Sequence, residues 1–174
     1  TGTLTEGKPK VTDVIAMGDI TEELLLQYSG SVEAKSNHPL SAAIIAEAKK
    51  RGITLLVAEN FQSLSGLGLE ATVDGRNVLV GTERLLRDKG ISTESMREEI
   101  AKLLAQGKTL SVISVDGSAV GLIGIFDAVR ESSKKTVTEL KRLGIETSMI
   151  TGDNQKIAEA VAGGKLSGDN VVAL

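Results

Sequence analysis

Two Asp-Gly pairs, each placed between two short β-prone runs, constrain the fold of this 174-residue chain more than any other feature. Asp74-Gly75 separates residues 71–73 from 77–80, and Asp116-Gly117 separates residues 109–115 from 119–125. Asp-Gly readily adopts the backbone angles of tight hairpin turns, so each pair predicts two adjacent antiparallel strands. The middle of the chain therefore predicts an antiparallel sheet.

Helical segments surround these strands. Thr21 is a suitable N-cap for a helix over residues 22–35, and Pro39 fits the first turn of a second helix that ends at Gly52. Two shorter helices are expected over residues 83–89 and from about residue 93 to 105. We expect residues 20–120 to form one domain, an antiparallel sheet with flanking helices.

The pattern changes after this domain. Residues 130–143 predict a basic amphipathic helix, residues 146–150 a short strand, and residues 153–162 another helix. Alternation of strand and helix is typical of a parallel α/β sheet. We expect residues 1–19 and 121–174 to form this partial second domain, with the glycine-rich run 163–170 as a loop. The fold class is therefore α/β (α+β), with the first domain inserted into the second.

Composition excludes several classes of function. The net charge of −3 gives no sign of a nucleic-acid partner, and the absence of cysteine rules out disulfides. A single histidine without cysteine disfavours a transition-metal site within the chain. No apolar run approaches the roughly 20 residues that span a bilayer, so we expect no membrane insertion by this chain. The start at Thr1, without a methionine, is typical of an excised fragment.

One candidate site lies at Thr151-Gly152-Asp153, which follows a β-prone run and opens a predicted helix. A strand end followed by a helix N-terminus presents backbone amides to an anion. The Thr151 hydroxyl could bind a phosphoryl oxygen, and Gly152 would let the backbone approach it. The alternative is that Asp153 simply caps its helix.

Three further candidates have equally plain alternatives. Asp127 lies where a strand meets a helix, and it could be a helix cap. His38 precedes a helix that begins at proline, where its ring could stack on a base, although a lone histidine is more often structural or exposed. Gly66 and Gly68 could let the backbone lie against a ligand, although glycines also mark bulges and bends.

Five motifs in this order and spacing resemble the cytosolic part of heavy-metal P-type ATPases. They are Thr-Gly-Thr-Leu-Thr at residues 1–5, Glu33-x4-His38-Pro39, Gly66-x-Gly68, Asp127-x-x-Arg130 and Thr-Gly-Asp-Asn at residues 151–154. Each motif alone is weak evidence, but the set is specific. The resemblance covers residues 1–162, and copper pumps are the most similar in character.

The resemblance implies two groups of site residues. The nucleotide-binding group consists of Glu33, His38, Gly66, Gly68, Leu69, Gly81 and Thr82. Thr82 departs from the asparagine that is usual in the family. The catalytic group consists of Thr1, Thr3, Asp127, Thr151, Gly152 and Asp153. In the family an Asp-Lys pair stands directly before the Thr-Gly-Thr-Leu-Thr motif, and its aspartate becomes phosphorylated. This chain starts at Thr1, so we expect it to be inactive alone.

The implied function is ATP-driven export of a cation, copper in the first place, through an aspartyl-phosphate. The implied ligands are ATP or ADP and Mg²⁺, and the implied partners are the transmembrane and actuator domains of a parent pump at the cytoplasmic face of a membrane. Two alternatives remain open. One is a non-catalytic module that binds adenine nucleotides or docks a partner, and the other is a haloacid dehalogenase-type phosphatase.

Overall fold

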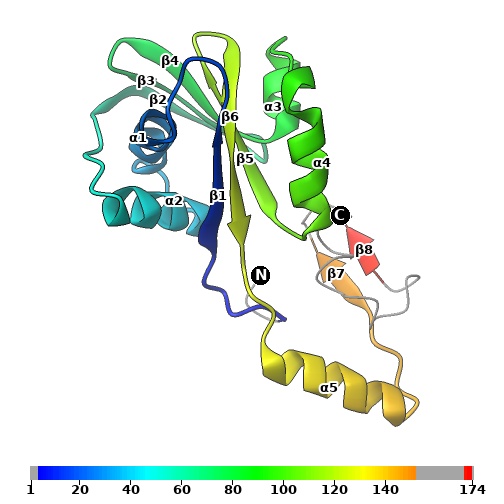
Figure 1. Cartoon of the computed structure of the whole chain (residues 1–174). Coiled ribbons are helices and arrows are strands. Elements are labelled where there is room, and N and C mark those ends of the chain that lie inside the picture. Colours follow the sequence, from blue (N-terminus) through cyan, green and yellow to red (C-terminus); the bar gives the residue numbers. More distant parts are fainter. Residues whose placement is uncertain (1–3, 152–170, 174) are drawn as a thin grey trace.

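A six-stranded antiparallel sheet forms the centre of the computed structural model, which describes residues 4–151 and 171–173 (Figure 1). In spatial order the strands are β1 (Lys10–Ala16), β6 (Ser118–Phe126), β5 (Thr109–Val115), β4 (Arg76–Gly81), β3 (Gly68–Val73) and β2 (Ala58–Leu64). Every neighbouring pair is antiparallel. The antiparallel sheet predicted from the sequence is confirmed.

Both Asp-Gly pairs form the predicted two-residue hairpin turns. Asp74 and Gly75 have φ angles of 51° and 73°, and Asp116 and Gly117 have φ angles of 49° and 79°. Positive φ at both central residues is the signature of a type I′ turn, whose twist matches that of the flanking strands. These turns fix the registers of β3 with β4 and of β5 with β6.

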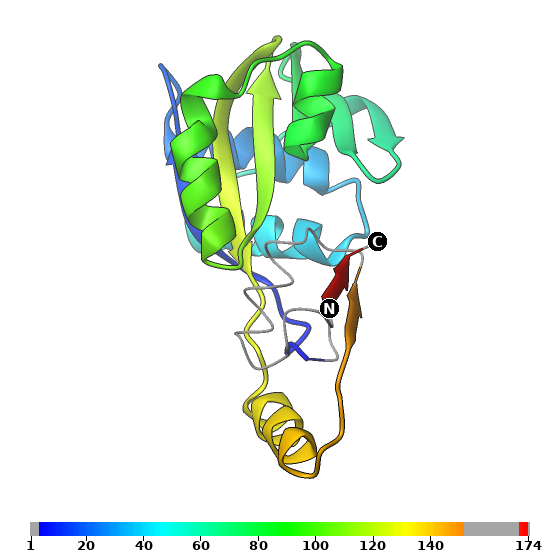
Figure 2. The ribbon, with the colours of Figure 1, turned by 90° about the vertical axis from the view of Figure 1, so that its right-hand side faces the viewer.

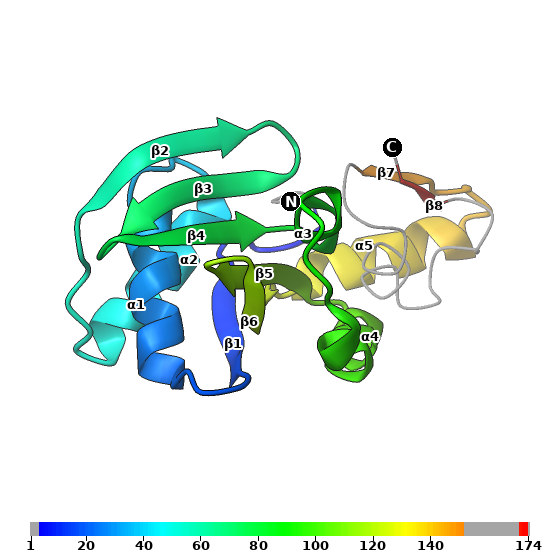
Figure 3. The ribbon, with the colours of Figure 1, turned by 90° about the horizontal axis from the view of Figure 1, so that it is seen from above.

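Helices cover both faces of the sheet (Figure 3). On one face lie α1 (Glu22–Glu33) and α2 (Pro39–Lys50), and on the other lie α3 (Glu83–Asp88) and α4 (Arg97–Ala105), the latter preceded by the 3₁₀ turn η1 (Glu94–Met96). Thr21 caps α1 as predicted, because its hydroxyl accepts a hydrogen bond from the Leu24 amide. Pro39 is the first residue of α2, also as predicted.

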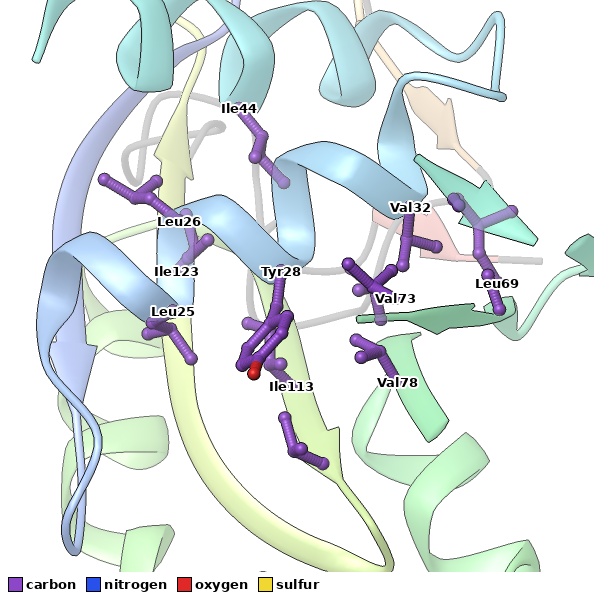
Figure 4. Packing of buried hydrophobic residues seen from close by; sticks show 14 of the residues in the cluster. Leu25, Leu26, Tyr28, Val32, Ile44, Leu69, Val73, Val78, Ile113 and Ile123 are labelled. Carbon is purple, nitrogen blue, oxygen red and sulfur yellow. The ribbon is translucent and has the colours of Figure 1, made fainter. Parts of the chain in front are cut away.

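Each face of the sheet has its own aliphatic core. Leu25, Leu26 and Val32 of α1 pack with Ile44 and with strand residues such as Ile113 and Ile123 (Figure 4). On the opposite face, residues of α3 and α4 pack against the other side of the same strands; the buried members of this second cluster are Leu79, Leu85, Leu86, Met96, Ile100, Leu103, Val112 and Leu122. Because both faces are covered, β5 and β6 are runs of consecutive buried residues.

The sheet extends beyond the boundaries that we predicted for the first domain. Strand β1 pairs along its length with β6, from Lys10 opposite Phe126 to Ala16 opposite Gly121. Residues 10–16 and 121–126 therefore belong to the antiparallel sheet, although the predicted boundaries at 19 and 121 assigned them to the other domain. The pairing of β1 with β6 could not be seen locally, because more than 100 residues of chain separate the two strands.

The last part of the chain lies apart from the sheet (Figures 1 and 2). It contains α5 (Glu131–Arg142) and the strands β7 (Met149–Thr151) and β8 (Val171–Ala173), which pair in parallel. A parallel pair agrees with the α/β character predicted for this region. The helix predicted over residues 153–162 and the loop over 163–170 lie outside the described residues. Within the described ranges, no helix is both long and apolar enough to cross a membrane.

Candidate functional site

Glu33 and His38 lie at the junction of two helices. Glu33 is the last residue of α1, and His38 is the N-cap of α2. The Nδ1 atom of His38 accepts a hydrogen bond of 3.2 Å from the Leu40 amide. An imidazole that accepts at Nδ1 carries its proton at Nε2 when it is neutral, so the exposed ring offers a donor and an aromatic face to the surface. The helix cap thus holds the ring in one orientation.

Glu33 is buried rather than solvated, with 6% of its surface exposed. The Ser41 hydroxyl, in the first turn of α2, donates a hydrogen bond of 2.5 Å to Oε2 of Glu33. Burial raises the pKa of Glu33 because it disfavours the charged form, and the hydrogen bond from Ser41 opposes this shift in part. The sequence alone predicts that Glu33 is a solvated charge at a helix end. It could not show the packing of α2 against α1 that buries this side chain.

The glycines of the predicted nucleotide loop have two different roles. Gly66 lies in the turn between β2 and β3, where the Leu67 amide donates to the Leu64 carbonyl, and its φ of 71° favours glycine. A Cβ atom at Gly66 would meet no other atom within 4 Å, so the backbone of this turn is open.

Gly68 and Gly81 face each other across β3 and β4. A Cβ atom on Gly68 would lie 2.4 Å from the Val80 carbonyl oxygen, and a Cβ atom on Gly81 would lie 2.3 Å from the Leu67 carbonyl oxygen. Both positions therefore require glycine so that the two strands can approach each other. This requirement is structural, and it exists whether or not a ligand binds nearby.

Two other predicted nucleotide-binding residues already have structural partners. Leu69 is 8% exposed, and its side chain belongs to the core beneath α1. A contact with a ligand would have to come from its backbone. Thr82 is the N-cap of α3, where its hydroxyl accepts a hydrogen bond of 3.2 Å from the Leu85 amide. The hydroxyl can still donate its own proton.

The strand register places Gly68 and Gly81 at one end of the sheet. Gly81 pairs with Val112 and Thr109 pairs with Ile125, so the last residues of β4 and β6 and the first residues of β3 point toward the same end. Val32, next to Glu33, packs near Leu69 and Val73 (Figure 4). The end of α1 therefore lies over the start of β3, close to the Gly66 turn.

Asp127 emerges at this same end of the sheet and holds the segment before β1. Its two carboxylate oxygens accept hydrogen bonds from the amides of Gly7 and Lys8, at 3.2 and 3.1 Å. Nearby, the Arg130 guanidinium donates to the Thr5 carbonyl at 2.7 Å. The motif Asp127-x-x-Arg130 thus joins the two chain segments that connect the sheet to the rest of the molecule.

Most of the remaining predicted catalytic residues lie outside the part of the chain that the structure describes. These are Thr1, Thr3, Gly152 and Asp153, and Thr151 is described only as the last residue of β7. Among the residues that are described, no group of three or more histidine, aspartate or glutamate side chains could hold a metal ion. Ser41, which the sequence did not single out, lies beside the candidate residue Glu33.

Comparison with known proteins shows the family to which the chain belongs. The sequence profile of the haloacid dehalogenase-like hydrolases matches residues 1–171. The copper-exporting P-type ATPase of Bacillus subtilis is 40% identical over 162 residues, which cover 93% of this chain and 20% of that protein. The copper-exporting P-type ATPase B of Archaeoglobus fulgidus is 42% identical over 162 residues, covering 93% and 23%. The chain thus spans about a fifth of the length of these curated relatives.

Solved structures of P-type ATPases are similar to this chain. A zinc-transporting PIB-type ATPase in the E2.Pi state superimposes with a TM-score of 0.73 and 32% identity, over 99% of this chain and 28% of that one. The N-domain of a copper-transporting P-type ATPase superimposes with a TM-score of 0.58 and 27% identity, over 68% of this chain and 99% of that domain.

Proposed function

Because the chain belongs to the haloacid dehalogenase-like hydrolase family, we propose that it is the nucleotide-handling part of a heavy-metal P-type ATPase. The observation that carries this proposal is the junction of α1 and α2, where the buried Glu33 carboxylate and the oriented His38 ring flank one short loop. Both residues belong to the motif Glu33-x4-His38-Pro39. In this proposal the whole protein couples ATP hydrolysis to the export of a cation, and the named relatives favour copper.

The nucleotide base would bind beside this junction. The carboxylate of Glu33 can accept a hydrogen bond from the amino group of adenine, and the His38 ring can stack on the base or donate from Nε2. The open backbone of the Gly66 turn and the backbone at Gly68, Leu69 and Gly81 would border the rest of the nucleotide. The Thr82 hydroxyl, which accepts a hydrogen bond from the Leu85 amide, could donate its own proton to the nucleotide.

The phosphates would point toward the second domain. Gly66, Gly68, Gly81 and Asp127 lie at the end of the sheet from which the chain continues to α5. We propose that residues 10–126 are the nucleotide-binding domain. They make up about two thirds of the chain, which agrees with the share that the solved N-domain covers. Residues before 10 and after 126 would belong to the phosphorylation domain.

Phosphoryl transfer in this proposal needs groups from the second domain. The Thr1, Thr3 and Thr151 hydroxyls, with the amides at Gly152 and Asp153, would orient the transferred phosphoryl group. Mg²⁺ would bind through the phosphates of the nucleotide and neutralise part of their charge. The actuator and transmembrane domains of a pump would be the partners, at the cytoplasmic face of its membrane.

The proposal predicts weak, specific binding of ATP or ADP. Small polar sites of this kind give affinities in the high-micromolar to millimolar range, about 4 to 6 kcal/mol. Titration of nucleotide against the amide NMR spectrum should shift signals around Glu33, His38 and Gly66. His38→Ala should weaken binding by about tenfold, the loss of one stacking or hydrogen-bonding contact.

The matched control is His38→Asn. Asparagine is an equally good N-cap, so this variant keeps α2 intact while it removes the ring. Both variants should lose affinity by a similar factor. Shifts confined to the far end of the sheet, or an unchanged affinity in both variants, would contradict the site.

A further inference from the structure

Ser41 and Glu33 form a buried pair that joins the two helices of the site. Ser41 is 0% exposed and Glu33 is 6% exposed, and their hydroxyl and carboxylate are 2.5 Å apart. Ser41 lies in the first turn of α2, among the apolar residues Leu40, Ala43 and Ile44. Among the described side chains, the Ser41 hydroxyl forms a hydrogen bond with the Glu33 carboxylate alone.

The two oxygens of Glu33 have different surroundings. Oε2 accepts the hydrogen bond from Ser41. Oε1 has no hydrogen-bond partner among the described residues. If it were fully buried it would be a buried polar atom without a partner, but in that part of the chain the one such side-chain atom is Ser114 Oγ. Oε1 therefore reaches the surface. The carboxylate is anchored through one oxygen and presents the other as an open acceptor.

Among the described residues, no charged neighbour acts on the pKa of the Glu33 carboxyl group. Helix α1 packs against α2 and against strands β1 to β4. Among the described groups of these elements, and of the loop with Lys35 and His38, only Ser41 acts on the pKa of Glu33 besides burial. Burial raises this pKa, and the hydrogen bond from Ser41 lowers it because it stabilises the charged form. Loss of the hydroxyl would leave burial unopposed.

We propose that Ser41 is a positioning residue for base selection, which holds Glu33 so that Oε1 remains a charged acceptor for the amino group of a 6-aminopurine. This inference rests on the proposed nucleotide site. A 6-oxopurine such as hypoxanthine presents a carbonyl oxygen at the same place, and two facing acceptors repel each other. A protonated Glu33 could instead donate to that carbonyl. The ratio of ATP to ITP affinity therefore reports the state of this carboxyl group.

The test measures ATP and ITP binding by calorimetry between pH 5 and pH 8. The unaltered chain should prefer ATP by about tenfold or more at pH 8, the usual penalty for an unpaired polar group at a built site. Ser41→Ala should reduce this ratio by about threefold to tenfold, the effect of one lost hydrogen bond to a charged group. It should also move the pH at which the preference disappears to a higher value.

Two controls separate this role from a merely structural one. Ser29→Ala removes another fully buried serine of the same helix pair, whose hydroxyl bonds to the Leu25 carbonyl of its own helix. It should leave the ratio and its pH profile unchanged. In Glu33→Gln, the additional change Ser41→Ala should have no further effect on the ratio. An equal loss of ATP and ITP affinity in Ser41→Ala, with an unmoved pH profile, would overturn the role of Ser41.

The same experiment distinguishes failure of this inference from failure of the proposed function. If the unaltered chain prefers ATP and Glu33→Gln removes the preference, but Ser41→Ala does not, then the nucleotide site stands and the role of Ser41 falls. If the unaltered chain binds neither ATP nor ITP, the proposed function is overturned and this inference with it.

Discussion

The sheet with its four helices and the region around α5 are stabilised in opposite ways. In the sheet, two aliphatic cores cover both faces, and side chains such as Leu26 and Ile123 are completely buried. In residues 131–150, none of the described side chains is buried, and Leu143 and Ile150 are 67% and 71% exposed. The sheet therefore contains the apolar packing that it needs for stability, whereas the described part of the α5 region does not.

The largest expected contrast is between Leu26 and Leu143. Leu26→Ala removes a fully buried side chain and should lower the free energy of unfolding by about 2 to 5 kcal/mol. Leu143→Ala changes an exposed side chain and should alter this free energy by no more than about 0.5 kcal/mol. Urea unfolding followed by circular dichroism measures both. Similar losses in the two variants would mean that the two regions share one core.

A smaller contrast is expected between two glycines with positive φ. Gly68 (φ 149°) lies against backbone atoms of β4, whereas a Cβ atom added to Gly144 (φ 75°), which follows α5, would meet no other atom within 4 Å. Gly144→Ala should cost only the strain of the left-handed conformation, about 1 kcal/mol. Gly68→Ala must also move β4. Its cost should therefore exceed that of backbone strain alone, which is about 1 to 3 kcal/mol.

Thermal unfolding of the two glycine variants provides the measurement. If Gly68→Ala is as mild as Gly144→Ala, the close approach of β3 and β4 is not a constraint on the sheet. The role of Gly68 would then lie in ligand binding rather than in strand packing.

Local signals in the sequence predicted those parts of the fold that local chemistry decides. The Asp-Gly turns, the Thr21 cap and Pro39 at the start of α2 are each determined within a few residues. Strand β2 was not predicted, because this edge strand exposes polar residues on both sides and is interrupted by an irregularity between Glu59 and Gln62. An exposed edge strand lacks the alternation that identifies a half-buried one.

The candidate site shows the same division. The motifs singled out Glu33, His38 and Gly66 as candidates, but the sequence could not show that Glu33 is buried or that Ser41 donates to it. Both facts depend on how α2 packs against α1. The strand register, which brings Asp127 and Gly68 to one end of the sheet, is likewise a property of the assembled sheet.

The smallest expected contrast concerns two ion pairs. Asp13 and Lys108 are 2.6 Å apart and their side chains are 25% and 15% exposed, whereas Glu139 and Arg142 of α5 are 59% and 75% exposed. Asp13→Asn should lower the free energy of unfolding at pH 7 by about 1 kcal/mol, because Lys108 loses a partner in a half-buried place. Glu139→Gln should have an effect of no more than about 0.5 kcal/mol.

The pH dependence of this contrast has a defined sign. Burial, the largest influence, raises the pKa of Asp13, but the hydrogen bonds from Lys108 and Thr12 and the charges of Lys108 and Lys102 together lower it below its ordinary value. A carboxyl group with a lowered pKa in the folded state stabilises the fold above its unfolded pKa, and this contribution is lost as the pH falls through the lowered value. The difference between the unaltered chain and Asp13→Asn should therefore be constant from pH 8 to about pH 5 and shrink below about pH 4. A difference that persists unchanged in acid would show that Asp13 acts through its shape and hydrogen bonding rather than through its charge, and the ion pair would then not distinguish the sheet from the α5 region.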